Sequence, residues 1–434
     1  MTSIATPERQ AAAGAIDGDR ALRDFLFLAA VLLTWFTVSP FQDLSDPHLL
    51  DAKDSGDLIS QASAVLLTGA LVAFAVFKRT FMVTRAVTLP LVATFAVFAV
   101  STLLSSYPDV AGRRLVLAGF TIFQATLLLL LPYGKEHFAR LLAIAAIIIL
   151  AACYFGVAFL PHLSIHQASD VAEPELAGDW RGFFTHKNGA GAGMVLLIFI
   201  GLFVYRAWNR FAGIAIVAAA AVFLYFTHSK SPINLLPVVL MLSYVIPRVR
   251  GVVPMLALVV GVPLLIDLLT VGSVLFEPIS NLVGSLMADP TFTGRDVIWD
   301  FALEKLAQRP LFGYGFEAFW SMPDLLAAWS FQETWGLRAS DAHNGYLNLA
   351  VTTGLVGLAV SLGWIVLQPL ADLRRACARG CDPALTTLFV QIWLFGLCLA
   401  GFESVFFGGG SALWFLMVVA IVGLRFQAIA TSRG

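Results

Sequence analysis

Residues 141–160 read LLAIAAIIILAACYFGVAFL, a run of twenty residues without one charged side chain. A helix of that length spans the roughly 30 Å hydrocarbon core of a bilayer. Comparable apolar runs recur from Phe25 to Leu424, and the 434-residue chain is 59% hydrophobic and 13% charged. Soluble proteins are about 25% charged. The composition therefore excludes a soluble multidomain protein and predicts an all-α polytopic membrane protein.

Twelve apolar runs can be marked along the chain. Each is expected to be a helix, because lipid offers no partner to an unpaired backbone group. The runs lie near residues 25–41, 58–77, 86–104, 115–132, 138–160, 188–205, 211–226, 232–246, 252–275, 345–370, 384–402 and 411–430. We thus expect about 12 transmembrane helices, the first nine within 25–275 and the last three within 345–430. An N-terminal tail (1–24) and a large loop (276–344) lie outside them.

Basic residues indicate which side each loop faces. Of the 27 Lys and Arg residues, 17 fall in the two termini and in alternate loops, whereas the first of the other loops is rich in Asp. Cytoplasmic loops carry the excess of Lys and Arg, so we predict that both termini are cytoplasmic and that loop 276–344 lies on the outer side of the membrane. Arg113 and Arg114 are exceptions, expected to snorkel to the interface. The net charge of −1 argues against nucleic-acid binding.

The loop 276–344 is long enough to need a function of its own. Thr293 and Asp296 resemble a capping box, which predicts a helix over Arg295–Gln308 before Pro310. We therefore expect a partly helical loop. Four tryptophans in it are expected to rest on the membrane interface or to stack on sugar rings. They are Trp299, Trp320, Trp329 and Trp335.

Polar residues gather at three places on the predicted outer face: segment 180–189, segment 227–231 and the two ends of the large loop. Four are cations suited to holding a phosphate: Arg181, Lys187, Lys230 and Arg295. Three are histidines, the residue type best suited to act as a general base near neutral pH: His186, His228 and His343. Asn188 and Asn344 lie beside them as supporting residues. An external cationic pocket with a histidine suits a lipid-linked phosphate substrate.

Each of these residues alone has a simpler explanation. A Lys or Arg at a span end is ordinarily an interfacial anchor, and a lone histidine is more often structural than catalytic. Only the clustering favours a functional site. His162 and His166, four residues apart, lack a third ligand. No metal site is therefore expected.

The outer-face residues resemble a known family. His343-Asn344, nine residues, then Gly354-Leu355-Val356-Gly357 is similar to the HN-x9-GxxG signature of the O-antigen ligase and Wzy-type polysaccharide polymerase superfamily. Segment 310–315 (PLFGYG), Gly294-Arg295 with Trp299, and segment 185–188 (THKN) look like further parts of its pattern. The resemblance covers about residues 185–357.

The resemblance implies a GT-C-like fold in the bacterial inner membrane, with loop 276–344 and the active site in the periplasm. It also implies a metal-independent, inverting glycosyl transfer from an undecaprenyl-pyrophosphate-linked glycan, with no cofactor. The acceptor is lipid A-core in ligases and another lipid-linked repeat unit in polymerases; a chain-length regulator is a further expected partner. Ligases commonly carry Ser-Arg where this chain has Ser229-Lys230. The lysine resembles the exopolysaccharide polymerases and favours a polymerase.

The predicted mechanism has His343 as the general base and Arg295 with Lys230 as pyrophosphate ligands, while Arg181 and Lys187 are second-tier candidates. His186 and His228 remain alternative bases. No acidic cluster is expected beside His343.

Two other functions stay open. One is a metal-dependent glycosyltransferase that uses Asp43, Asp46 or Asp51. The other is a lipid transporter or flippase, for which Asp267 is the main candidate for a charge within a span.

Overall fold

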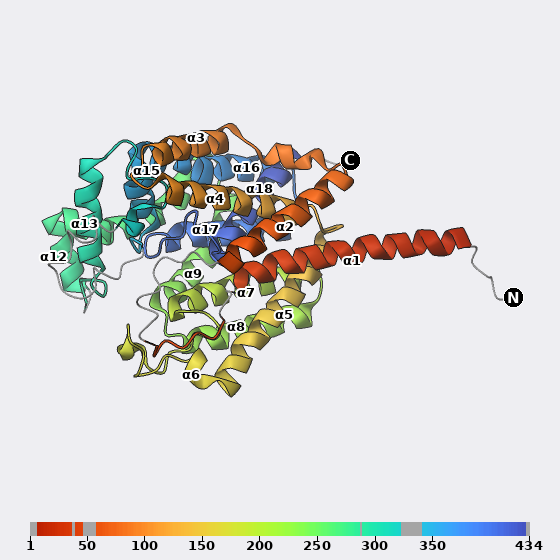
Figure 1. The fold of residues 1–434 in the computed structure, drawn as a ribbon, viewed down its shortest axis with the longest axis horizontal. Coiled ribbons are helices and arrows are strands. Elements are labelled where there is room, and N and C mark those ends of the chain that lie inside the picture. Colours follow the sequence, from red (N-terminus) through yellow and green to blue (C-terminus); the bar gives the residue numbers. More distant parts are fainter. Residues whose placement is uncertain (1–6, 37–39, 47–57, 287–288, 323–340, 431–434) are drawn as a thin grey trace.

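The computed structural model describes residues 7–36, 40–46, 58–286, 289–322 and 341–430. These residues form helices joined by turns and contain no β-strand; one isolated bridge pairs Ile165 with Trp180. Figure 1 shows most of the long helices running along the long axis of the molecule. The α-helices are α1 Pro7–Trp35, α2 Leu58–Phe77, α3 Leu89–Leu103, α4 Pro108–Leu128, α5 Lys135–Phe159, α6 Pro161–Ser164, α7 Lys187–Ala207, α8 Arg210–Phe226, α9 Lys230–Val245, α10 Val252–Leu269, α11 Val271–Leu275, α12 Glu277–Leu286, α13 Arg295–Gln308, α15 Gly345–Leu362, α16 Gln368–Ala378, α17 Pro383–Leu399 and α18 Ala412–Ile429.

Every one of the twelve predicted runs contains a helix. Among the described residues, six helical stretches are long and apolar enough to cross a membrane. They are 135–159, 187–207, 230–248, 252–269, 345–378 and 412–429. Shorter apolar helices include α3, α8 and α17. The all-helical, multi-pass membrane architecture is therefore confirmed, whereas the count of twelve spans and the GT-C likeness remain predictions.

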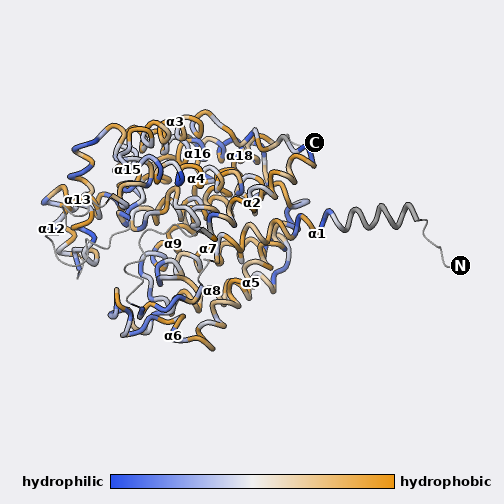
Figure 2. Tube along the Cα trace, in the orientation of Figure 1, coloured by the Kyte–Doolittle hydropathy of each residue, from blue (hydrophilic) through white to orange (hydrophobic). Residues whose placement is uncertain are grey.

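Helices α7 and α17 form the centre of the bundle. α7 is buried over most of its length and packs on α5, α8, α9 and α17. Small residues near its start allow this: a Cβ on Gly191 would lie 2.7 Å from Ser229 Cβ, and one on Gly193 would lie 2.9 Å from the Phe184 ring. Figure 2 shows the helices mainly apolar and the polar residues gathered at the two ends.

The segment between α10 and α15 forms a small core of its own. α13 has the predicted bounds, Arg295–Gln308. Its expected cap is wrong, because Gly294 occupies the N-cap and no side chain caps the helix. Thr293 instead donates its backbone N–H to Asp289 at 2.8 Å.

Two of the tryptophans in this segment belong to that core. Trp299 and Trp320 are buried, and their indole N–H groups donate to Ala342 O and to Asn348 Oδ1. An interfacial or sugar-stacking role is therefore wrong for these two; Trp329 and Trp335 lie outside the described residues. The snorkelling expected of Arg114 is also wrong. Its guanidinium donates to Glu317 O and to Ser321 Oγ, which holds the large loop onto α4.

The two ends of the bundle differ. In Figure 1, α1 begins and α18 ends at one end of the molecule, whereas α12 and α13 lie at the other. This agrees with an even number of crossings. Which end faces the periplasm remains a prediction from the basic residues.

Candidate active site

The starts of four helices meet around one carboxylate, that of Glu403 in the turn after α17. Its Oε1 accepts from Arg295 Nη2 of α13 at 3.1 Å and from Asn188 Nδ2 of α7 at 3.0 Å. Its Oε2 lies 3.4 Å from His343 Nδ1, just before α15. α9 joins through its N-cap, since Ser229 Oγ donates to Asn188 Oδ1 at 3.0 Å. The structure therefore brings together four of the predicted regions: 188, 229–230, 295 and 343.

Local backbone geometry presents His343 at this point. The residue has a φ of 46°, in the left-handed region that a side chain rarely adopts. Its backbone N–H donates to Asp341 Oδ1 at 2.7 Å. The next residue, Asn344, is the N-cap of α15 and accepts from Leu347 N. Strain of this kind is typical of functional sites, where the surroundings hold it in place.

Asp267 completes the support of this turn. Its Oδ1 accepts from Asn344 Nδ2 at 2.7 Å, and the same amide donates to Gly401 O. Asp267 therefore ties the end of α10 to the start of α15, directly behind His343.

The absence of acidic groups expected beside His343 is wrong. Glu403 Oε2 and Asp341 Oδ1 lie 3.4 and 3.9 Å from its Nδ1. Burial disfavours the imidazolium, but the hydrogen bond to Glu403 and the charge of Asp341 outweigh it and raise the pKa of His343. Burial likewise opposes ionisation of Glu403, yet Arg295 and His343 lower its pKa to about 2. Glu403 is thus a carboxylate at neutral pH, and it favours the His343 tautomer that carries its proton on Nδ1 and leaves Nε2 as an acceptor.

The two principal cations differ in their partners. Arg295 donates to Glu403 and to Phe402 O, so its guanidinium is fixed at the edge of the site. Lys230 is exposed and forms no hydrogen bond or ion pair with the residues that the structure describes, although its charge lowers the pKa of Asp289. The fixed guanidinium of Arg295 thus lies at the start of α13, and the exposed ammonium of Lys230 lies at the start of α9.

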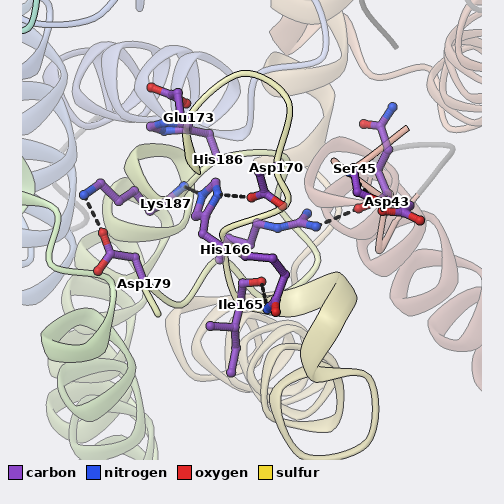
Figure 3. A network of polar contacts seen from close by, with 12 residues as sticks. Asp43, Ser45, Ile165, His166, Asp170, Glu173, Asp179, His186 and Lys187 are labelled. Carbon is purple, nitrogen blue, oxygen red and sulfur yellow. Dashed lines mark hydrogen bonds and ion pairs between the residues drawn. The ribbon is translucent and has the colours of Figure 1, made fainter. Parts of the chain in front are cut away.

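Lys187, His186 and His228 contact acidic residues of the segment that leads into α7, and Figure 3 shows Lys187 with Asp179 and His186 with Glu173. Lys187 Nζ and His228 Nδ1 share the carboxylate of Asp179, each at 2.6 Å. His186 uses both ring nitrogens: Nδ1 accepts from Asn188 N, and Nε2 lies 2.9 Å from Glu173 Oε2. His186 therefore has no free nitrogen with which to act as a base.

Arg181 is only 1% exposed. Its guanidinium donates to Phe184 O and to Gln42 O, so it joins segment 40–46 to the chain just before α7. This geometry favours an anchoring role, and its assignment as a phosphate ligand stays a prediction.

The family-like glycines fix the distance between Arg295 and His343. Gly354 interrupts α15 with a φ of 74°, and a Cβ there would lie 2.1 Å from Leu311 O. Segment 310–315 therefore lies main chain to main chain against α15: Leu355 N donates to Pro310 O at 2.8 Å and Gly315 N to Thr352 O at 2.9 Å. This contact joins the chain after α13 to α15, the helix that follows His343.

Sequence reasoning missed Glu403 and named Asp267 only as a charge within a span. Glu403 carries a signal that could have found it, because it is an isolated acidic residue at the predicted outer end of a span. For the metal-dependent alternative, Asp51 lies outside the described residues, while Asp43 accepts from Ser45 N and Oγ. Among the described residues, no group of three or more His, Cys, Asp or Glu is placed to hold a metal ion.

Comparison with known proteins identifies the relatives of this site. A model of the O-antigen ligase family (Wzy_C) matches residues 215–362. The resemblance to the O-antigen ligase and Wzy-type polymerase superfamily is thereby confirmed. The matched segment contains Lys230, Arg295 and His343 but neither Asn188 nor Glu403.

A curated relative points towards exopolysaccharide synthesis. The chain is 31% identical over 110 residues to the exopolysaccharide production protein ExoQ of Rhizobium meliloti (strain 1021). The alignment covers 25% of this chain and 25% of that relative. The membrane character and the resemblance to O-antigen ligases are confirmed, whereas exopolysaccharide production is a property of the relative.

Proposed function

We propose that this protein is an inverting membrane glycosyltransferase that uses an undecaprenyl-pyrophosphate-linked glycan in the periplasm and polymerises exopolysaccharide or O-antigen repeat units. The observation that carries the proposal is the pairing of His343 with Glu403 where the starts of α7, α9, α13 and α15 meet. Helix starts favour anions, and Arg295 and Lys230 add two cations. A phosphate-bearing donor suits that field.

In the proposed reaction, His343 Nε2 takes the proton of an acceptor hydroxyl. The hydroxyl oxygen bonds to the anomeric carbon while the bond from that carbon to the pyrophosphate oxygen breaks. One displacement inverts the anomeric centre, and undecaprenyl pyrophosphate leaves as an anion. Arg295 and Lys230 stabilise the charge that grows on the leaving group; placed donors of this kind contribute a few kcal/mol.

Glu403 has a positioning role in this scheme. Its carboxylate orients the imidazole through Nδ1 and fixes the Arg295 fork on its other oxygen. One residue thus sets the base and the phosphate ligand relative to each other. The arrangement resembles that of hydrolases in which a carboxylate orients the catalytic histidine.

The test is complementation of a strain that lacks this gene, followed by gel analysis of surface glycans. Wild type should restore high-molecular-weight polymer, and His343→Ala should not, at equal protein level. Restoration by His343→Ala would refute the proposed base. Loss of the lipopolysaccharide ladder, with polymer still accumulating on its lipid carrier, would indicate the alternative of an O-antigen ligase acting on lipid A-core.

The same strain separates the remaining alternatives. Loss of activity in membranes treated with EDTA would favour the metal-dependent mechanism. Accumulation of untransferred lipid-linked repeat units on the cytoplasmic side would favour a flippase. Asp267 offers little support to the latter, because it holds Asn344 at the end of α10.

A further inference from the structure

A cavity of about 140 Å³, with a mainly apolar lining that carries several polar groups, lies between segment 40–46 and the segment that leads into α7. One water needs about 10–15 Å³ of such space, so the cavity has room for about ten water-sized groups, the size of one hexose ring. Three carboxylate residues and a histidine line it beside apolar side chains. The lining residues used below are Asp46, His166, Asp170, Glu173, Leu44 and Val171.

The chemistry of the lining suits a sugar ring. Asp170 is 6% exposed; its Oδ2 lies 2.9 Å from His166 Nδ1, while its other oxygen has no hydrogen bond to the residues that the structure describes. Such an oxygen can accept from a ligand hydroxyl, and buried acceptors of this kind need a partner. Leu44 and Val171 offer an apolar surface to ring carbons. A sugar likewise has hydroxyls at its edge and C–H groups on its faces.

The cavity adjoins the candidate active site through one residue. Glu173 Oε2 lies 2.9 Å from His186 Nε2, and His186 sits at the start of α7 beside Asn188, a ligand of Glu403 (Figure 3). Burial opposes the ionisation of Glu173, but the hydrogen bond from His186 and the charges of His186 and His343 lower its pKa. The charge of His343 therefore reaches the wall of the cavity.

The lining also selects by charge. Burial lowers the pKa of His166, which leaves this histidine neutral near pH 7. Three carboxylates, of Asp46, Asp170 and Glu173, line the cavity, and two cations oppose them: His186 beside Glu173 and Arg181 near Asp170. Carboxylates remain in excess, so a sugar that carries its own carboxylate would meet like charge, which disfavours its binding.

We propose that this cavity is a subsite for one neutral sugar ring of the glycan, and that its carboxylates exclude rings bearing a carboxylate. The inference rests on the proposed function, because the glycan is its ligand. The ring can belong to the donor or to the acceptor, and kinetics separate the two.

A matched pair of substitutions tests the space. Both alanines of the pair are exposed. Ala172 lines the cavity, and Ala177 does not line it. In the full chain, purified in detergent with a lipid-linked repeat of neutral hexoses, Ala172→Trp should raise one KM at least tenfold with kcat within threefold. Ala177→Trp should change neither. A raised KM for donor alone or for acceptor alone identifies which glycan the cavity holds.

A second pair of substitutions tests the selection by charge. This test remains valid even if Ala172→Trp fails to fold. Wild type should use a neutral repeat at least tenfold better, in kcat/KM, than the matched repeat containing a hexuronate. Glu173→Gln should narrow that ratio to about threefold, while Glu175→Gln, an exposed control outside the cavity, should leave it unchanged.

The outcomes keep the two proposals apart. No transfer by wild type, or full activity of His343→Ala, overturns the proposed function. Transfer that depends on His343 but is indifferent to both Ala172→Trp and Glu173→Gln overturns the subsite alone.

Discussion

Replacing Glu403 by Gln tests the central pairing of the site. The change keeps the shape of the side chain and removes its charge, 3.4 Å from His343 Nδ1. At that distance a unit charge pair is worth about 1 kcal/mol in water and about 5 kcal/mol at an effective dielectric constant of 20. About a quarter of each side chain is exposed, so solvent screens the pair towards the lower of these figures, and we expect the pKa of His343 to fall in the variant.

The sign of the kinetic effect follows from the role of His343. A general base works in its neutral form, so activity rises with pH through the pKa of His343, which lies above the usual 6.5 in the wild type. In Glu403→Gln that acidic limb of kcat/KM should move to lower pH. The plateau above it should fall about 10- to 100-fold, because neither the imidazole tautomer nor the Arg295 fork is held by a charge.

The assay is the rate of polymer formation from lipid-linked repeat units by the purified chain between pH 5 and 9. Glu304→Gln, an exposed residue of α13 with 62% of its side chain accessible, is the matched control and should follow the wild-type profile. An acidic limb that stays in place in Glu403→Gln would refute the pairing. A limb that moves to higher pH would show that Glu403 does not stabilise the imidazolium.

Three further changes follow from the same geometry. Gly354→Ala should lower the unfolding midpoint well below that of Gly363→Ala, since Gly354 has a φ of 74° against Leu311 O and Gly363 has open space; strain of this kind costs about 1–3 kcal/mol. Equal melting curves would contradict this. Arg295→Lys should reduce kcat at least tenfold, because the fork is lost; an unchanged kcat would make Arg295 an anchor. Lys230→Ala should raise the KM for the lipid-linked donor, while Lys230→Arg should retain it, and the two are compared by steady-state kinetics.

The helices could be predicted from the sequence because membrane spans obey a local rule. Each predicted run contains a helix, and α13 has the predicted bounds, although the capping box of Thr293 and Asp296 that located its start is not formed. Hydropathy and helix-breaking residues act over a short stretch of chain, so their effect can be predicted without knowledge of the tertiary structure. The predicted cap of α13 and the predicted surroundings of Trp299 and Trp320 were wrong. The burial of a tryptophan depends on distant partners: the Trp299 indole donates to Ala342 O, 43 positions away.

The site divides in the same way. His343, Arg295 and Lys230 could be named because they stand next to span ends on one predicted side. Glu403 could not, since its meaning comes from Arg295, Asn188 and His343, which lie 60 to 215 positions away along the chain. An arginine beside a span, such as Arg181, resembles a phosphate ligand in sequence. Its burial and its two main-chain carbonyl acceptors favour an anchoring role, and its assignment as a phosphate ligand stays a prediction.

The structure suggests a physical reason for the spacing between His343-Asn344 and Gly354 in the family-like motif. From Gly345 to Thr353, α15 runs about 13 Å before Gly354 interrupts it. α13 packs against α15, and its chain returns to α15 at the interruption, where Gly315 N donates to Thr352 O. Both helices therefore start at the candidate site and are joined again at the level of Gly354. The glycine sets how far the start of α13 projects beside that of α15, and hence where Arg295 stands relative to His343. A residue that touches no substrate can in this way control the alignment of the base with the phosphate ligand.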